Sequence, residues 1–195
     1  ARQSRRGSDK GRVRATVSRT IIFPAQLGVK GDYTELSEKL ESRNPESRCF
    51  VAPLRRLGWI AGLLPSLPTA DYLKGTLKPA QTLRFYCEAV DAAVEDALRD
   101  AQNAQEGKED VQVSLNLVGH SIGGWIARFW LSEWASPSVR ARVRTLVTLG
   151  TPHADALDTR LDQTRGLLSY VNREFPGAYQ DGVDYVCVVG DRADL

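Results

Sequence analysis

The sequence predicts an α/β fold in which a mostly parallel sheet carries helices on both faces. Two observations predict it. Short apolar runs with the composition of buried strands alternate with longer segments of helical periodicity, the order typical of a parallel sheet. One of these runs, residues 113–118, leads directly into a glycine-rich turn and then into a helix-compatible segment. The 195 residues are 42% hydrophobic, which suffices for the core of one domain.

The predicted strands are five apolar runs, each followed by a proline or a glycine. They lie at residues 20–23, 49–52, 113–118, 144–149 and 185–189. The predicted helices are residues 32–40, 82–105, 125–134 and 157–175. Asp32 is the expected N-cap of the first helix. In the third helix, aromatic residues recur at helical spacing, which is typical of a core-facing stripe. Residues 55–80 contain three prolines and are expected to be irregular.

Charge and cysteine content exclude several functions. The formal charge is only +2, so nothing indicates a nucleic-acid partner, and no apolar run approaches the roughly 18–20 residues of a membrane span. Cys49, Cys87 and Cys187 are widely spaced and lack a C-x-x-C or Cys/His pattern. We therefore expect buried, reduced thiols and no metal site.

The N-terminus differs from the rest of the chain, because its first 20 residues hold seven Lys or Arg against one acid. Residues 1–18 are rich in Arg and Ser and have no hydrophobic periodicity. We expect them to be unpacked, with the folded domain beginning at residue 19. Their composition fits a plastid or mitochondrial transit peptide, which would place the protein in a plastid; a plain basic tail on a cytoplasmic protein is the alternative.

The glycine-rich turn reads Gly119-His120-Ser121-Ile122-Gly123, a G-x-S-x-G pattern between a strand and a helix. A serine hydroxyl becomes a useful nucleophile when a sharp turn lifts it clear of the backbone and a base can reach it. Such a turn needs small neighbours, which explains the flanking glycines. The N–H of Ile122 would stabilise a developing oxyanion. The alternative is a tight turn of another α/β protein, with Ser121 as an ordinary turn residue.

Three motifs in this order resemble those of α/β-hydrolases of the lipase/esterase type. They are Pro24-Ala25-Gln26-Leu27-Gly28 after the first strand, the Gly119–Gly123 elbow, and Leu149-Gly150-Thr151-Pro152-His153 after the next strand. The third is similar to a string in many lipases and in GPI inositol-deacylase-like hydrolases. Residues 31–33, 55–59 and 72–79 resemble plant and algal plastid-targeted members of that group. The resemblance covers about residues 19–195.

The resemblance implies a serine hydrolase that cleaves carboxylic esters, with lipid-like acyl esters as the expected substrates. Ser121 is the expected nucleophile, and the N–H groups of Gln26 and Ile122 are the expected oxyanion donors. No cofactor or metal is implied. A small-molecule or lipid ester is the expected partner, with peripheral membrane contact possible. Relatives usually carry Gly where this chain has Ala25, which restricts the backbone of the oxyanion loop.

The base and acid of the triad are not evident. The fold's order is Ser, then Asp or Glu, then His, but the only histidines are His120 inside the elbow and His153 before the last predicted strand. His153 is a candidate site-lining residue, and Asp191 and Asp194 are candidate acids. The chain is thus expected to be the N-terminal part of a hydrolase fold that is incomplete at its C-terminus, with the catalytic histidine beyond Leu195. The alternative is a non-catalytic α/β-hydrolase-like domain that binds a partner or a lipid.

Overall fold

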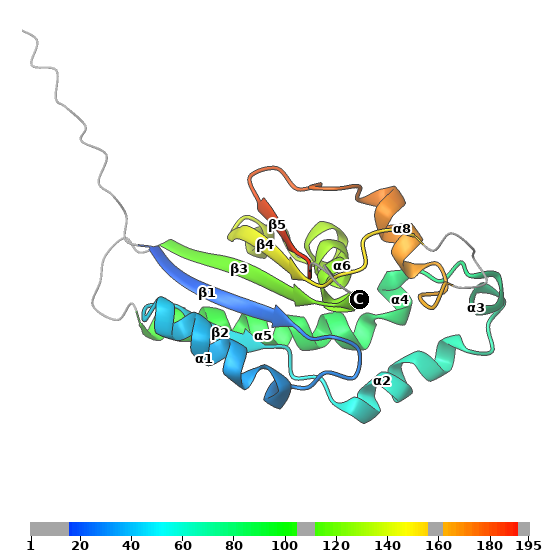
Figure 1. Ribbon diagram of the computed structural model, residues 1–195, viewed down its shortest axis with the longest axis horizontal. Coiled ribbons are helices and arrows are strands. Elements are labelled where there is room, and N and C mark those ends of the chain that lie inside the picture. The colour runs from blue at the N-terminus through cyan, green and yellow to red at the C-terminus, as the bar shows by residue number, and fades with distance from the viewer. Residues whose placement is uncertain (1–15, 105–111, 156–161, 191–195) are drawn as a thin grey trace, which may run out of the picture.

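The computed structural model describes residues 16–104, 112–155 and 162–190, and it confirms the predicted α/β fold. Its five strands form one sheet in the order β2-β1-β3-β4-β5, and every neighbouring pair is parallel (Figure 1). The strands are β1 Thr16–Phe23, β2 Arg48–Val51, β3 Gln112–His120, β4 Val143–Leu149 and β5 Asp184–Val188. Each predicted strand is present, with ends that differ by a few residues.

Strand β1 begins four residues before the predicted strand, so the expected unpacked tail is wrong for residues 16–18. β1 pairs with β3 from Thr16 to Phe23, and the Ser18 hydroxyl accepts a hydrogen bond from the Asn116 amide at 2.8 Å. Arg19 is buried and forms an ion pair with Asp100 at 2.6 Å. These polar side chains have partners that are distant in the sequence, so composition could not reveal them. The rest of the tail prediction lies outside the described residues.

The helices between the strands are α1 Thr34–Arg43, α5 Arg84–Asn103, α6 Ile122–Phe129, α7 Pro137–Arg140 and α8 Leu167–Glu174. A π-helical turn, η3 Trp130–Trp134, continues α6. Asp32 is not the N-cap of α1. It lies in the 3-10 turn η1 Lys30–Tyr33, where its carboxylate accepts the Val29 N–H at 3.0 Å. Of the predicted helix 157–175, residues 157–161 lie outside the described residues. Residues 163–166 form a turn instead, because the Asp162 carboxylate accepts the N–H groups of Thr164 and Gly166.

The prediction that residues 55–80 are irregular is wrong. They contain α2 Arg56–Leu63, η2 Leu64–Ser66 and α3 Ala70–Lys74, and α4 Pro79–Thr82 begins at their end. Two of the prolines lie in the first turn of η2 and of α4, where a missing N–H costs no helical hydrogen bond. The Thr69 hydroxyl caps α3 by accepting the Tyr72 N–H at 3.2 Å. The prolines at positions 65 and 79 therefore begin helical turns and do not make the segment irregular.

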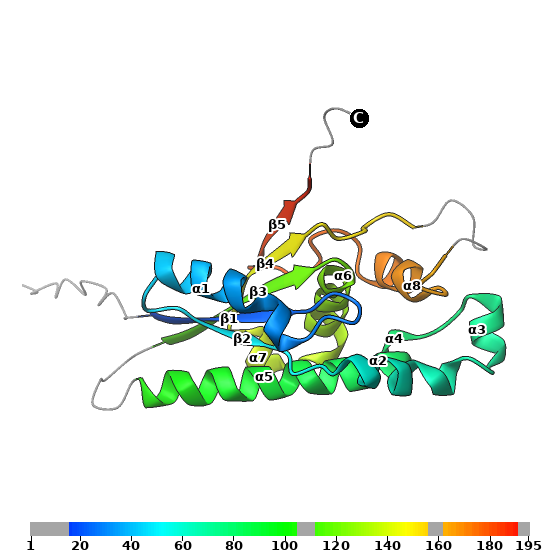
Figure 2. The same cartoon turned by 60° about the horizontal axis from the view of Figure 1, so that its bottom comes forward.

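The sheet separates two apolar layers, as its alternating side chains require. Ile21 and Leu117 join the larger layer with α5, α6 and α8, whereas Ile22 and Val118 join a smaller one beneath α1. Figure 2 shows α1 and α5 on opposite sides of the sheet. No helix among the described residues is both long and apolar enough to cross a membrane.

Two further predictions concern side chains in these layers. The aromatic stripe of α6 and η3 does belong to the core: Trp125, Phe129 and Trp130 are buried, and Trp134 is partly buried against them. The indoles of Trp130 and Trp134 both donate to the Asp91 carboxylate, at 2.8 and 2.7 Å. The expectation of buried thiols is correct for Cys87, but Cys49 is only partly buried. It is wrong for Cys187, which is exposed on β5, the edge strand of the sheet that the described residues form.

Candidate active site

The candidate site lies where the order of the strands reverses. The chain passes from β1 outward to β2 and then returns to the other side of β1 as β3. In parallel sheets, a crevice opens beyond the carboxyl ends of the two strands at such a point. Here the loop of residues 24–28 follows β1, and Ser121 follows β3 directly. Both strands point toward the end of the molecule that carries α2, α3 and α8 (Figure 1).

Ser121 occupies the sharp turn between β3 and α6. Its φ of 52° and ψ of −124° lie in a region that favours glycine and costs other residues about 1–3 kcal/mol. Neighbouring backbone holds the strained residue in place: its N–H donates to the Leu149 carbonyl at 2.8 Å, and its carbonyl accepts the Gly124 N–H at 3.1 Å. A serine retained in this conformation is typical of a functional turn.

Three glycines around Ser121 permit close backbone approaches. A side-chain carbon on Gly119 would strike the backbone of Gly124, so the strand and the new helix nearly touch. One on Gly124 would strike the Thr151 side chain after β4. One on Gly123 would strike the carbonyl oxygens of Phe23 and Pro24 at the end of β1. Gly123 therefore allows the start of the loop after β1 to lie close to the elbow.

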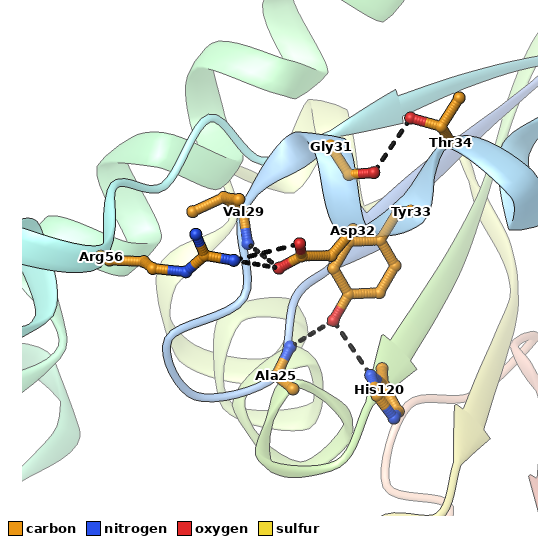
Figure 3. Close-up of polar contacts among 8 residues, drawn as sticks. All are labelled: Ala25, Val29, Gly31, Asp32, Tyr33, Thr34, Arg56 and His120. Carbon is orange, nitrogen blue, oxygen red and sulfur yellow. Dashed lines mark hydrogen bonds and ion pairs between the residues drawn. The ribbon is translucent and has the colours of Figure 1, made fainter.

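Two tyrosine hydroxyls hold the loop after β1. Tyr86 of α5 donates to the Pro24 carbonyl at 2.7 Å, and Tyr33 of η1 accepts the Ala25 N–H at 2.6 Å (Figure 3). The Gly28 N–H closes the loop onto the Ala25 carbonyl at 2.9 Å. The left-handed φ of this loop, 60°, falls on Leu27 and not on Ala25. Alanine therefore fits at position 25 without strain.

The backbone N–H groups of Gln26 and Ile122 are unpaired within the described residues. Both residues line one cavity of about 400 Å³. The rest of its wall is largely apolar and includes Trp59, Leu63, Leu67, Leu83, Trp125 and Leu168. Two free donors on residues that line a largely apolar cavity can bind a developing negative charge, since no competing hydrogen bond must first be broken.

The Tyr33 hydroxyl also binds His120 at the end of β3. Tyr33 therefore connects the loop after β1 with the strand that leads to Ser121. The hydroxyl oxygen lies 3.0 Å from His120 Nδ1, and the rings meet edge to face (Figure 3). Burial raises the pKa of Tyr33, so the hydroxyl stays protonated and can donate to a neutral imidazole. His120 is thus linked through Tyr33 to the loop of residues 24–28 and is not bonded to Ser121.

The second histidine, His153, has other partners and lines a different cavity. Its Nε2 lies 3.1 Å from the Thr148 hydroxyl and 3.7 Å from the Cys187 thiol. It lines a cavity with Cys187, Arg128 and Tyr185 and is absent from the wall of the cavity beside Ile122. Neither histidine of the chain is therefore bonded to Ser121. Asp191 and Asp194 lie outside the described residues.

The environment of His153 predicts a pH effect on stability. Burial, and secondarily the charge of Arg128, lower its pKa below the usual 6.5. As the pH is lowered below 6.5, His153 becomes protonated in the unfolded chain before it does in the folded protein. We therefore expect the free energy of unfolding to fall with the pH until the lowered pKa of the folded protein is passed. Urea unfolding across this range checks it. His153→Gln should flatten the slope, and an unchanged slope in that variant would contradict the assignment.

Sequence reasoning missed Tyr33 and Tyr86. Tyr33 belongs to the Gly31-Asp32-Tyr33 string that marked the resemblance, but nothing local indicated its partners, which are Ala25 and His120. Tyr86 lies on the apolar face of α5. A tyrosine at such a position indicates that its hydroxyl has a hydrogen-bond partner, because buried tyrosines usually bond one, and this was the one signal in the sequence.

The parallel sheet, the strained serine turn and the loop beside it define a protein of the α/β-hydrolase type. Comparison with known families is consistent with this class: the model of the PGAP1-like alpha/beta domain matches residues 80–191, more than half of the chain. The chain belongs to this family. The match includes the elbow and begins after the loop of residues 24–28. A search of curated proteins found no match.

Proposed function

We propose that this chain supplies the nucleophile and oxyanion hole of a serine hydrolase that cleaves carboxylic esters. One observation carries the proposal: Ser121 is held at a positive φ between β3 and α6, and neither the adjacent Ile122 N–H nor the Gln26 N–H of the loop after β1 has an acceptor among the described residues. The strain at Ser121 is costly, and the two free N–H groups are available to a ligand. Their coincidence has a purpose in acyl transfer, where a nucleophile and an oxyanion site must adjoin.

The reaction proceeds in two halves. Ser121 Oγ attacks the acyl carbonyl carbon, its proton passes to a base, and the carbonyl oxygen becomes an oxyanion bound by the N–H groups of Gln26 and Ile122. The C–O bond to the alcohol then breaks, and the base returns the proton to the departing alcohol. Water repeats the sequence on the acyl-enzyme, which releases the carboxylic acid and restores the serine.

The base in this proposal is a group outside these 195 residues. His120 is engaged with Tyr33, and His153 with Thr148 and Cys187. In this fold the histidine follows the acid, which follows the serine. The cavity wall of leucines and tryptophans favours an apolar acyl group, since each buried methylene contributes about 0.8 kcal/mol.

Chemical rescue tests the proposal on the chain itself. Imidazole in solution replaces the missing base, and a p-nitrophenyl acyl ester is the substrate. We expect imidazole to speed p-nitrophenol release by the protein beyond its direct reaction with the ester, and mass spectrometry to find the acyl group on Ser121. Longer acyl chains should react faster. Protein that adds nothing to the imidazole reaction and carries no acyl-serine would contradict the proposal.

A non-catalytic binding domain is the second candidate, favoured by the engagement of both histidines elsewhere. It predicts that ligands enter the cavity beside Ile122 without forming an acyl-serine. The rescue experiment separates the two, because only a catalytic elbow becomes acylated.

Tyr33→Phe should slow acylation while leaving ester binding largely intact. The change removes the acceptor of the Ala25 N–H and the partner of His120, so the loop that presents the Gln26 N–H loses its anchor. Losing a buried hydrogen bond costs about 1–2 kcal/mol, or roughly 5- to 30-fold in the imidazole-dependent rate. Tyr179→Phe, on the exposed surface, is the matched control. A rate equal to that of the control would argue against this role.

A further inference from the structure

The segment from α2 to α3 exposes an unusual number of large apolar side chains. We define the leucine surface as Leu57, Ile60, Leu64, Leu67 and Leu73, which are between 45% and 78% exposed. Isolated exposed apolar residues are ordinary, but five within 17 residues of one segment mark an interaction site. Both ribbon views place α2 and α3 at the end of the molecule toward which β1 and β3 point (Figures 1 and 2).

Helix α2 is apolar on both sides. Its inner side carries Trp59, which is buried and meets the rings of Phe85 and Tyr86 edge to face at 5.3 and 5.5 Å. Its outer side carries Leu57 and Ile60, continued by Leu64, at the three- and four-residue spacing of one helical face. A helix at a water-facing surface normally has a polar outer side. The packing of the inner side holds α2 on the domain, whereas the apolar outer side has no such role and is available to a partner.

The charges beside the leucine surface are positive. Residues 53–78 contain four basic residues, Arg55, Arg56, Lys74 and Lys78, and one acid, Asp71. Arg56 is occupied by Asp32 at 3.2 Å. The other three basic residues are exposed and have no carboxylate within ion-pair distance among the described residues. Apolar side chains next to unpaired cations complement a bilayer that contains acidic lipids. Its interior is apolar and its headgroup surface is anionic.

The leucine surface is continuous with the candidate site. Leu67 is exposed and also lines the cavity beside Gln26 and Ile122, and Leu63 of α2 lines the same cavity. An acyl chain leaving a membrane under α2 would pass from one apolar environment into another without crossing water. This segment precedes the region that the family model matches, so it is a feature of this chain and not of that match.

We propose that the leucine surface docks on an anionic lipid bilayer. The proposal stands on the exposed residues alone and does not depend on the proposed ester hydrolysis. Insertion of the leucine side chains supplies the apolar part of the contact, and Arg55, Lys74 and Lys78 meet acidic headgroups.

Vesicle co-sedimentation of the full chain tests the contact. Vesicles of equal parts phosphatidylcholine and phosphatidylglycerol are compared with pure phosphatidylcholine. The basic N-terminal residues also attract anionic lipid, so binding is measured again at about 0.5 M salt, where screening acts within roughly 4 Å. We expect the triple variant Leu57→Ser, Ile60→Ser and Leu73→Ser to bind the mixed vesicles at least about tenfold more weakly at high salt.

Matched variants make the result specific. Val186→Ser with Val189→Ser, at exposed residues on β5 and just after it, should bind like the unchanged chain. Arg55→Gln with Lys74→Gln and Lys78→Gln should weaken the preference for anionic vesicles at low salt, where the basic N-terminal residues supply the part that remains. The leucine variant should keep its melting temperature and its imidazole-dependent reaction with a soluble ester, because none of its three residues lines the cavity.

Ser121→Ala separates the two proposals, since it should bind vesicles normally whether or not the chain hydrolyses esters. Vesicle binding that is equal in the leucine variant and the unchanged chain would overturn the membrane assignment. So would a chain that ignores both vesicle types but sediments as a dimer, with the leucine variant monomeric, because the surface would then join two copies of the protein.

Discussion

Ser121→Ala is expected to abolish the protein's contribution to ester hydrolysis. In the imidazole-rescue assay, p-nitrophenol release should fall to the rate of imidazole with the ester alone, and no acyl-protein should form. When the base is supplied by the polypeptide, removing the nucleophile costs about 10⁵–10⁶ in kcat, which leaves what binding and the oxyanion hole provide. Steady-state rates and intact-protein mass measure both. Ser42→Ala, exposed on α1, is the control and should change neither.

A second variant at this position tests the strain. Ser121→Gly also removes the hydroxyl but suits the φ of 52° far better than serine does. We expect it to be inactive and to raise the free energy of unfolding by about 1 kcal/mol relative to Ser121→Ala. Equal stability of the two variants in urea would show that the turn is not strained, and the argument that it is retained for catalysis would fail.

Gly123→Ala should destabilise the fold strongly. The new methyl group would strike two backbone carbonyls, those of Phe23 and Pro24, which cannot rotate away as a side chain can. We expect a loss of about 3 kcal/mol, the upper end for overpacking, which lowers the melting temperature of a domain of this size by roughly 10 °C. Because the displaced backbone leads into the loop of Gln26, acylation of Ser121 should fall as well.

The control for this prediction is Gly31→Ala. Its methyl group meets no atom within 4 Å, and its φ is ordinary for an L-residue, so it should leave stability unchanged or raise it by up to about 1 kcal/mol. Thermal unfolding followed by circular dichroism compares the two. A melting temperature for Gly123→Ala equal to that of Gly31→Ala would mean that β1 and α6 do not approach as closely as described.

The sequence alone determined the class of fold and the position of the serine. Five apolar runs became five parallel strands. Burial selects such runs through their own composition in the central strands β1, β3 and β4, whereas β5 is mostly exposed and is held by its pairing with β4. The elbow was evident because its requirements lie within a few residues: a strand, small neighbours and a helix. The same local reasoning failed at residues 55–80, where prolines that begin helices are indistinguishable by composition from those that end them.

Only the tertiary structure decided which groups surround the serine. Tyr86 meets Pro24 across 62 positions of the chain, and Tyr33 meets His120 across 87. The tertiary structure links His120 through Tyr33 to the loop of residues 24–28 and places His153 in a separate cavity, although both histidines lie within sequence motifs. One side of α2 is exposed in the tertiary structure, although the composition of this helix is that of a buried one. Local patterns record what a segment prefers, whereas hydrogen-bond partners and covered faces depend on how distant segments meet.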